Sequence, residues 1–208
     1  MIPVLTPLAV GWHGKLPCRG DFVGRGLPPD WLRSWDDALR NSLAMMEQRG
    51  DPTLRQRLAA LPPWQGLVLP TAPGLPAWLC LVLASSDAVG RAYPLLLAEA
   101  HAPVGLDTLS LAALRTRGRQ WALIAQQALY SSSPQAFDQA AAALGAVSWR
   151  ALPAAEGGAD TVAHWRQQLP QGRSFWWPLQ APVGPDDSAP RAETWPPGAG
   201  LLAALLGP

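Results

Sequence analysis

The longest uninterrupted apolar run of the sequence, residues 77–84, constrains the fold more than any other segment. A membrane-spanning helix needs about 20 apolar residues, so this run is far too short to cross a bilayer. Its length suits a β-strand, but a strand with one face in water alternates apolar and polar residues. Every residue from Trp78 to Leu83 is apolar. We therefore expect a central strand in a sheet whose two faces are both covered.

Further strands are predicted on both sides of this run. Turn-prone segments at 70–76 and 86–91 separate three candidate strands, which lie at 64–69, 77–85 and 93–98. Connections this short favour antiparallel neighbours in one sheet. Two more strands are expected at 8–13 and 174–179.

Helical periodicity occurs between and after these strands. Asp30 is expected to cap a helix that ends at Gly50, and the apolar stripe of this helix has three- and four-residue steps. A long helix at 107–130 is expected to expose Arg115, Arg117 and Arg119. Shorter helices are expected at 52–60, from Pro134 onward and at 201–206, loops at 14–29 and 181–198, and mostly irregular chain at 149–172.

These elements together predict an α+β fold in a single domain covering residues 1–208. We expect a mostly antiparallel central sheet flanked by helices on both faces. Residues 1–100 would supply a glycine-rich loop, a helix and the strand hairpins, whereas residues 101–208 would supply helices, a late strand and a C-terminal helix.

Composition narrows the classes of partner. Only 15% of the 208 residues are charged and the formal net charge is +1, against roughly 25% charged residues in an average soluble protein. Without a basic stripe we expect no nucleic-acid partner. The N-terminal residues lack the basic start of a secretory signal, so we expect a cytoplasmic protein that is not inserted in a membrane.

Motifs for catalysis or cofactor binding are missing from the sequence. The segment around Lys15 resembles a phosphate-binding loop, but Ala9 and Leu16 stand where such a loop needs Gly and Ser or Thr. The histidines His13, His101 and His164 are widely separated and show no metal-binding spacing. We expect no cofactor, no metal and no enzymatic activity.

Two segments carry a family resemblance. Residues 11–23 read Gly-Trp-His-Gly-Lys-Leu-Pro-Cys-Arg-Gly-Asp-Phe-Val and are followed by Trp35-Asp36, and residues 87–95 read Asp-Ala-Val-Gly-Arg-Ala-Tyr-Pro-Leu. Both resemble the TagF (also called ImpM) family of type VI secretion-associated proteins, whose members carry these two signatures in this order. Trp176-Trp177 is similar to the late tryptophan pair of the family, so the resemblance spans nearly the whole chain.

The resemblance implies a function and a fold. TagF proteins are thought to be cytoplasmic, post-translational repressors of type VI secretion that bind the forkhead-associated scaffold protein of the apparatus. The implied fold is α+β and similar to longin-like modules. The resemblance implies protein binding rather than catalysis.

The residues of the two signatures are the first candidate site. Arg19, Asp21, Asp87 and Arg91 bring two positive and two negative charges, and we hypothesise that they pair across the two loops. Such a network can be structural or can contact a partner, and we favour the structural role. The remaining candidates in this set are Lys15, Trp35, Asp36 and Gly90.

A second candidate site consists of late tryptophans. Trp176, Trp177 and Trp195 border the predicted loop at 181–198, and Trp is favoured at interface hot spots. Alternation along a strand predicts that one of Trp176 and Trp177 is buried.

Two other functions remain open. A small enzyme using the glycine-rich loop would need a pocket in which Lys15, Arg19 and Asp21 converge with a histidine. A longin-like interaction module with a different partner would share the fold and lack any link to secretion.

Overall fold

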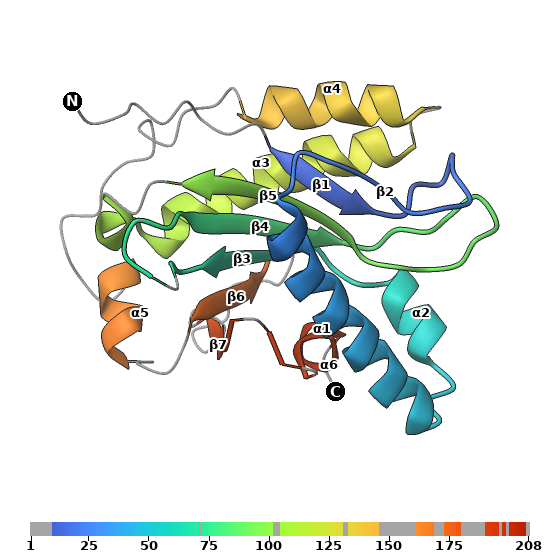
Figure 1. Cartoon of the computed structure of the whole chain (residues 1–208), viewed down its shortest axis with the longest axis horizontal. Helices are drawn as coiled ribbons and strands as arrows, with labels where there is room; N and C mark the ends of the chain where they lie inside the picture. The colour runs from blue at the N-terminus through green and yellow to red at the C-terminus, as the bar shows by residue number, and fades with distance from the viewer. Residues whose placement is uncertain are drawn as a thin grey trace.

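The computed structural model of the chain describes residues 10–70, 72–101, 105–130, 133–145, 161–168, 173–179, 190–195, 197–198 and 200–206. Within them, strands form one sheet in the order β2-β1-β5-β4-β3-β6-β7, and every neighbouring pair is antiparallel (Figure 1). The strands are β1 (Gly11–Gly14), β2 (Val23–Arg25), β3 (Trp64–Val68), β4 (Ala77–Leu83), β5 (Leu95–His101), β6 (Ser174–Pro178) and β7 (Arg191–Glu193).

Helices cover both faces of this sheet (Figure 1). One face packs against α3 (Leu111–Leu129), α4 (Pro134–Gly145) and α5 (Val162–Gln168), with the short 3-10 helix η1 (Leu106–Thr108) beside α5. The other face packs against α1 (Pro29–Gln48), α2 (Leu54–Ala59) and α6 (Leu201–Leu206). The predicted α+β architecture, with an antiparallel sheet between two helical layers, is confirmed.

Strand β4 shows why its sequence is apolar throughout. Leu79, Leu81 and Leu83 belong to the core under α3 and α4, whereas Cys80 and Val82 belong to the core under α1. All five side chains are at most 1% exposed. A strand that lies between two apolar layers needs an apolar residue at every position, because side chains alternate between the faces.

Some expectations about local structure are wrong. The predicted loop at 14–29 contains β2, and the predicted loop at 181–198 contains β7. Of the segment expected to be mostly irregular, 149–172, the structure describes residues 161–168, which include α5, and the rest lies outside the described residues. Asp30 does not cap α1, because the helix begins at Pro29 and its N-cap residue is Pro28. Proline is well suited to a first helical position, since its missing N–H would have no partner there.

Arg117 is also placed differently from the prediction. Its side chain is 1% exposed and points into the core between α3 and β5, where it forms an ion pair with Glu99. The prediction failed because periodicity assigns charged residues to the solvated face of a helix and cannot detect a buried partner of opposite charge.

Candidate protein-binding surface

The two signature segments lie together at one end of the sheet. The chain leaving β1 and the turn between β4 and β5 both lie at the right-hand end of the sheet in Figure 1. The backbone amide of Ala88 donates to the carbonyl of Arg19 at 2.8 Å, and the guanidinium of Arg91 donates to the carbonyl of Gly20 at 3.1 Å. The Ser85 hydroxyl donates to the carbonyl of Lys15 at 2.6 Å. These bonds join the loops across more than sixty residues of sequence.

Asp87 lies at the centre of the contact between these two loops, which we call the junction. Its carboxylate accepts a hydrogen bond from the Lys15 ammonium at 3.0 Å and one from the Arg91 guanidinium Nε at 2.6 Å. Its other oxygen accepts the backbone amides of Val89 at 3.1 Å and Arg91 at 2.9 Å. The residue is only 2% exposed, so two cations and two amides replace the water that the buried carboxylate has lost.

The environment of Asp87 favours its charged form. Burial by itself would raise the pKa of the carboxyl group, but the hydrogen bonds from the Arg91 amide, the Lys15 ammonium and the Arg91 guanidinium outweigh it. The pKa of Asp87 therefore lies well below its usual range. The junction holds a permanently ionised group at neutral pH.

The other signature residues have structural positions. Gly90 has a φ of +79°, a conformation that side chains disfavour, and its amide closes the turn on the Asp87 carbonyl at 2.9 Å. Trp35 is fully buried and stacks on Trp176 with 5.8 Å between ring centroids. Asp36 lies 3.3 Å from His13 Nε2 and so connects α1 with β1. Trp35 therefore belongs to the core and is inaccessible to a partner.

Some signature side chains remain exposed and take no part in this network. Arg19 and Asp21 are exposed, and neither forms an ion pair or side-chain hydrogen bond with any other residue that the structure describes. The hypothesis that the side chains of Arg19 and Asp21 pair with Asp87 and Arg91 is wrong. Asp87 accepts a hydrogen bond from Lys15 instead, and the Arg91 guanidinium donates to the backbone carbonyl of Gly20. Phe22 is 48% exposed and Val89 is 73% exposed. We name Arg19, Asp21, Phe22, Val89 and the 65% exposed side chain of Arg91 the signature surface.

Phe22 is held in place although it faces water. Its ring meets the edge of Tyr93 at 4.7 Å and stacks on His13 at 5.7 Å, while the Lys15 ammonium lies 5.3 Å from its centroid. A fixed aromatic ring loses little conformational freedom when a partner covers it. The sequence analysis missed Phe22 and Val89, although apolar residues within polar, glycine-rich loops are a signal that could have identified them.

The late tryptophans do not form the predicted exposed patch. Trp176 and Trp177 are both fully buried, because they point to opposite faces of β6 and helices cover each face. Trp177 donates to Gln65, and the ring of Trp176 lies so close to Gly66 that any side chain at Gly66 would collide with it. Trp195 is half-buried and stacks on Trp31 at 5.2 Å, so it alone of the three can contact a partner.

The residues named for the small-enzyme alternative are not bonded together in the described part of the chain. Lys15 is bonded to Asp87, His13 lies beside Asp36, and Arg19 and Asp21 form no bond with either. No group of three or more His, Cys, Asp and Glu side chains capable of holding a metal ion occurs within the described ranges. The bonds at the junction order the two loops, and other side chains of these loops remain exposed.

Comparison with known proteins identifies the family of the chain. The family model described as "TagF N-terminal domain, Type VI secretion system-associated" matches residues 11–146, which include both signatures and the junction at Asp87. The chain belongs to the TagF family. The chain is therefore associated with type VI secretion. The longin-like character of the fold stays a prediction, and so does the single domain over residues 1–208.

One solved structure is similar over most of the TagF chain. PA0076 from Pseudomonas aeruginosa PAO1 is 29% identical in sequence, with a TM-score of 0.60 over 85% of this chain and 86% of that one. A search of curated proteins found no match. None of the helices described here combines the length and hydrophobicity that crossing a bilayer requires.

Proposed function

We propose that this TagF chain is a non-catalytic, cytoplasmic repressor of type VI secretion that binds the forkhead-associated scaffold protein through the signature surface. The family membership supports a role in type VI secretion. The scaffold protein as partner, and repression as the outcome of binding, come from the resemblance of the two signatures to those of TagF proteins.

A single observation carries this proposal: some signature residues order the two loops, whereas others are exposed and form no bond with the described residues. Lys15, Asp87 and the backbone of Arg91 order the loops, whereas the side chains of Arg19 and Asp21 are not needed for that order. Arginine and aromatic residues with apolar neighbours are typical of interface hot spots. A rigid platform that presents Arg19, Asp21 and Phe22 can bind a protein with little loss of conformational entropy.

Co-purification with the scaffold protein from the same cell tests this proposal. We expect Arg19→Gln to weaken binding at least about fivefold, since an interface arginine loses a charge-assisted contact. The stability of the variant is expected to stay within about 0.5 kcal/mol of wild type, because no described residue bonds the Arg19 side chain. Titration of the purified scaffold protein gives the affinity, and urea denaturation gives the stability.

Arg49→Gln is the matched control. Arg49 is exposed at the end of α1 and lies 13 residues beyond Asp36, which contacts His13 of β1, so it is about 20 Å along the helix from that contact. The control is expected to bind like wild type. The proposed site is wrong if Arg19→Gln binds normally or if both variants weaken binding equally. The proposed partner is wrong if wild-type chain recovers no scaffold protein.

A further inference from the structure

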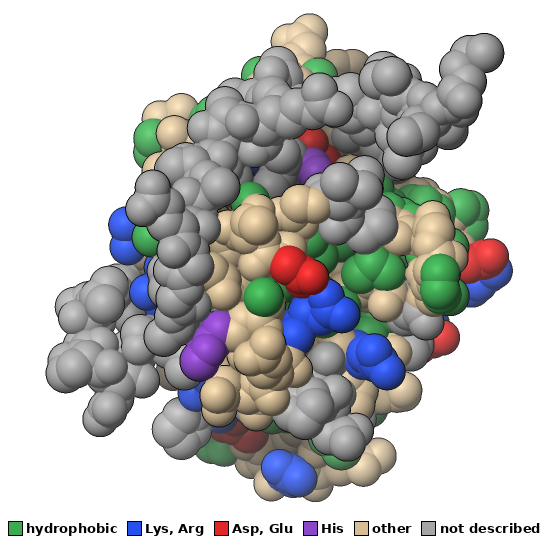
Figure 2. All heavy atoms as spheres, turned by 90° about the vertical axis from the view of Figure 1, so that its left-hand side faces the viewer, with side chains coloured by type: hydrophobic (Ala, Val, Ile, Leu, Met, Phe, Trp, Pro, Cys, Tyr) green, Lys and Arg blue, Asp and Glu red, His purple; other side chains and the backbone are tan. Residues whose placement is uncertain are grey.

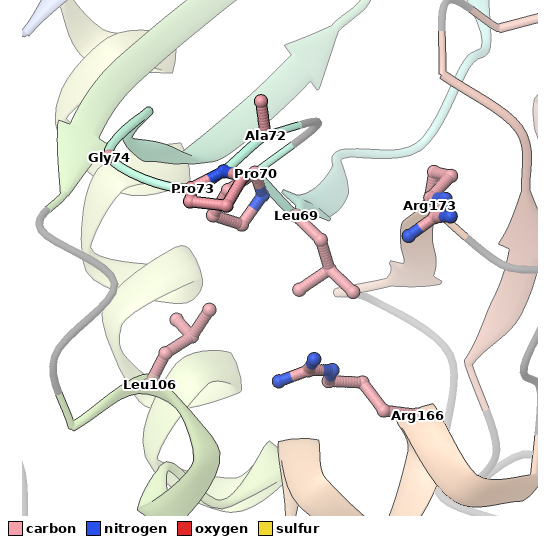
Figure 3. Close-up of a pocket in the computed structure, with 8 residues that line it drawn as sticks. All are labelled: Leu69, Pro70, Ala72, Pro73, Gly74, Leu106, Arg166 and Arg173. Carbon is pink, nitrogen blue, oxygen red and sulfur yellow. The ribbon is translucent and has the colours of Figure 1, made fainter.

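A second region with binding geometry lies at the opposite end of the sheet. A cavity of about 350 Å³ opens between the β3–β4 turn, η1, α5 and the chain entering β6. The residues around it are Leu69, Pro70, Ala72, Pro73, Gly74, Leu106, Arg166 and Arg173 (Figure 3). We name this cavity the arginine pocket. Figure 2 looks at this end of the molecule, where basic side chains (blue) lie beside acidic (red) and apolar (green) ones.

Two guanidinium groups face the same space. Figure 3 shows the side chains of Arg166 and Arg173 both directed toward the cavity, with Leu69 between them. Arg166 forms an ion pair with Asp107 at 2.7 Å. Arg173 is exposed, and its side chain has no counter-ion or hydrogen bond within the part of the chain that the structure describes. Among the described residues, Asp107 balances the charge of Arg166, and the charge of Arg173 is left unmatched.

The backbone holds both arginines in place. The amide of Arg173 donates to the carbonyl of Glu193 at 2.8 Å and its carbonyl accepts from the amide of Leu69 at 2.8 Å, so this residue extends β6 between β3 and β7. On the other side, the amide of Val162 donates to Leu109 at 3.0 Å and attaches α5 to the end of η1. These bonds fix the backbone positions from which the two arginine side chains extend.

The wall of the pocket combines apolar side chains with the two guanidinium groups. Leu69 and Leu106 are each 6% exposed and line it together with prolines of the β3–β4 turn. A wall of this kind can cover an apolar side chain, while a guanidinium group can bind a planar carboxylate through two parallel hydrogen bonds. The cavity volume lies at the lower end of the range for small-ligand sites, about 300–1,000 Å³, which suits one or two amino-acid side chains.

We propose that the arginine pocket binds the carboxylate of an acidic residue, flanked by an apolar residue, in a segment of a protein partner. One unmatched positive charge fits the single negative charge of a carboxylate and is too little for the two charges of a phosphate group. The net charge of +1 over the whole chain provides no long-range field for a nucleic acid. This inference does not depend on the identity of the partner that binds the signature surface.

A short peptide serves as the probe. NMR of the ¹⁵N-labelled chain, observing backbone and arginine Nε–H resonances, is titrated with acetyl-Leu-Asp-Leu-amide, with the Asn analogue and with the phosphoserine analogue. We expect the Asp peptide to shift the Arg173 resonances and to bind about tenfold more tightly than the Asn peptide, since a hydrogen bond between charged groups is lost. Arg173→Gln is expected to weaken binding of the Asp peptide by a similar factor.

Arg55→Gln is the matched control, because Arg55 is an exposed arginine of α2, which packs on the other face of the sheet. It is expected to bind the Asp peptide like wild type. Three outcomes would each overturn the proposal. The Asp and Asn peptides could bind equally, both variants could lose the same affinity for the Asp peptide, or the resonances could stay unshifted up to about 10 mM peptide. Tighter binding of the phosphoserine peptide would overturn the assignment to a carboxylate.

Discussion

Asp87 unites two segments that are distant in the sequence, because its carboxylate is bonded to Lys15 from one segment and to Arg91 from the other. A buried carboxylate is stable only when its lost hydration is replaced, and here cations and amides replace it. The side chains of Phe22 and Val89 are then held at the surface by loops whose geometry this one group determines.

Asp87→Asn is expected to reduce stability in a pH-dependent way. The folded-state pKa of Asp87 is lowered, so the unfolded chain binds a proton more readily, and this contribution to stability is complete above the ordinary Asp pKa. It is lost as the pH falls below about 4. Urea denaturation should therefore show wild type more stable than the variant at pH 7, with the difference shrinking toward pH 3.

Asp21→Asn is the control for this pH dependence. Asp21 is exposed and unbonded within the described residues, so its substitution should leave the pH profile of stability parallel to that of wild type. A stability difference between wild type and Asp87→Asn that stays constant from pH 7 to pH 3 would contradict the assigned role of the carboxylate.

The candidate site was partly predictable from single residues. Charged residues of opposite sign in two glycine-rich segments indicated that the loops pair, and the structure joins Lys15, Asp87 and Arg91. The sequence could not identify which side chains pair, because the partners of Asp87 depend on how β1 and β5 align. Backbone carbonyls that accept hydrogen bonds, such as that of Gly20, leave no trace in the sequence.

At the scale of elements, Arg117 connects two layers of the fold. The guanidinium on α3 donates to Glu99 of β5 at 3.3 Å and to the Leu144 carbonyl of α4 at 3.2 Å. It also lies 5.5 Å from the ring of Trp121. Glu99 and Arg117 are each 1% exposed, and His101 Nε2 lies 3.4 Å from Glu99. This buried charge pair fixes how α3 and α4 sit on the sheet.

Breaking this pair from either side is expected to be costly. Arg117→Met removes the guanidinium that pairs with the Glu99 carboxylate, and Glu99→Gln removes the negative charge that pairs with Arg117, so each change should destabilise the fold by about 3–5 kcal/mol. The double variant should lose less than the sum of the two, because both changes disrupt the same ion pair. Urea denaturation of wild type, the two single variants and the double variant gives the coupling free energy between Glu99 and Arg117. Strictly additive losses of stability would argue against a direct ion pair.

The strands and helices with a clear apolar pattern were predictable from the sequence, and the shortest strands were not. The run at 77–84 and the apolar stripes of α1 and α4 determine which side chains are buried, and on α4 these are Phe137, Ala141 and Leu144. By contrast, β2 and β7 have three residues each. A strand so short forms because a neighbouring strand pairs with its backbone, and such pairing has no periodic signal in the sequence.

At the scale of the whole molecule, β4 separates the two proposed binding regions. The signature surface follows its C-terminal end, and the arginine pocket borders the turn before its N-terminal end (Figure 1). Strand β4 contains seven residues, about 20 Å of extended chain. Both faces of this strand are covered by apolar cores, so the two regions are connected through a rigid sheet.

A rigid connection predicts that the two regions bind independently. Sites farther apart than about 10 Å with no shared contacts usually contribute additively, within about 0.5 kcal/mol. Arg19→Gln should therefore change the affinity of the acetyl-Leu-Asp-Leu-amide probe less than about twofold. In the double variant Arg19→Gln, Arg173→Gln, the loss of probe binding should equal that of Arg173→Gln alone. A tenfold effect of Arg19→Gln on the probe would instead show that the sheet transmits a structural change, because a direct contact across the length of β4 is impossible.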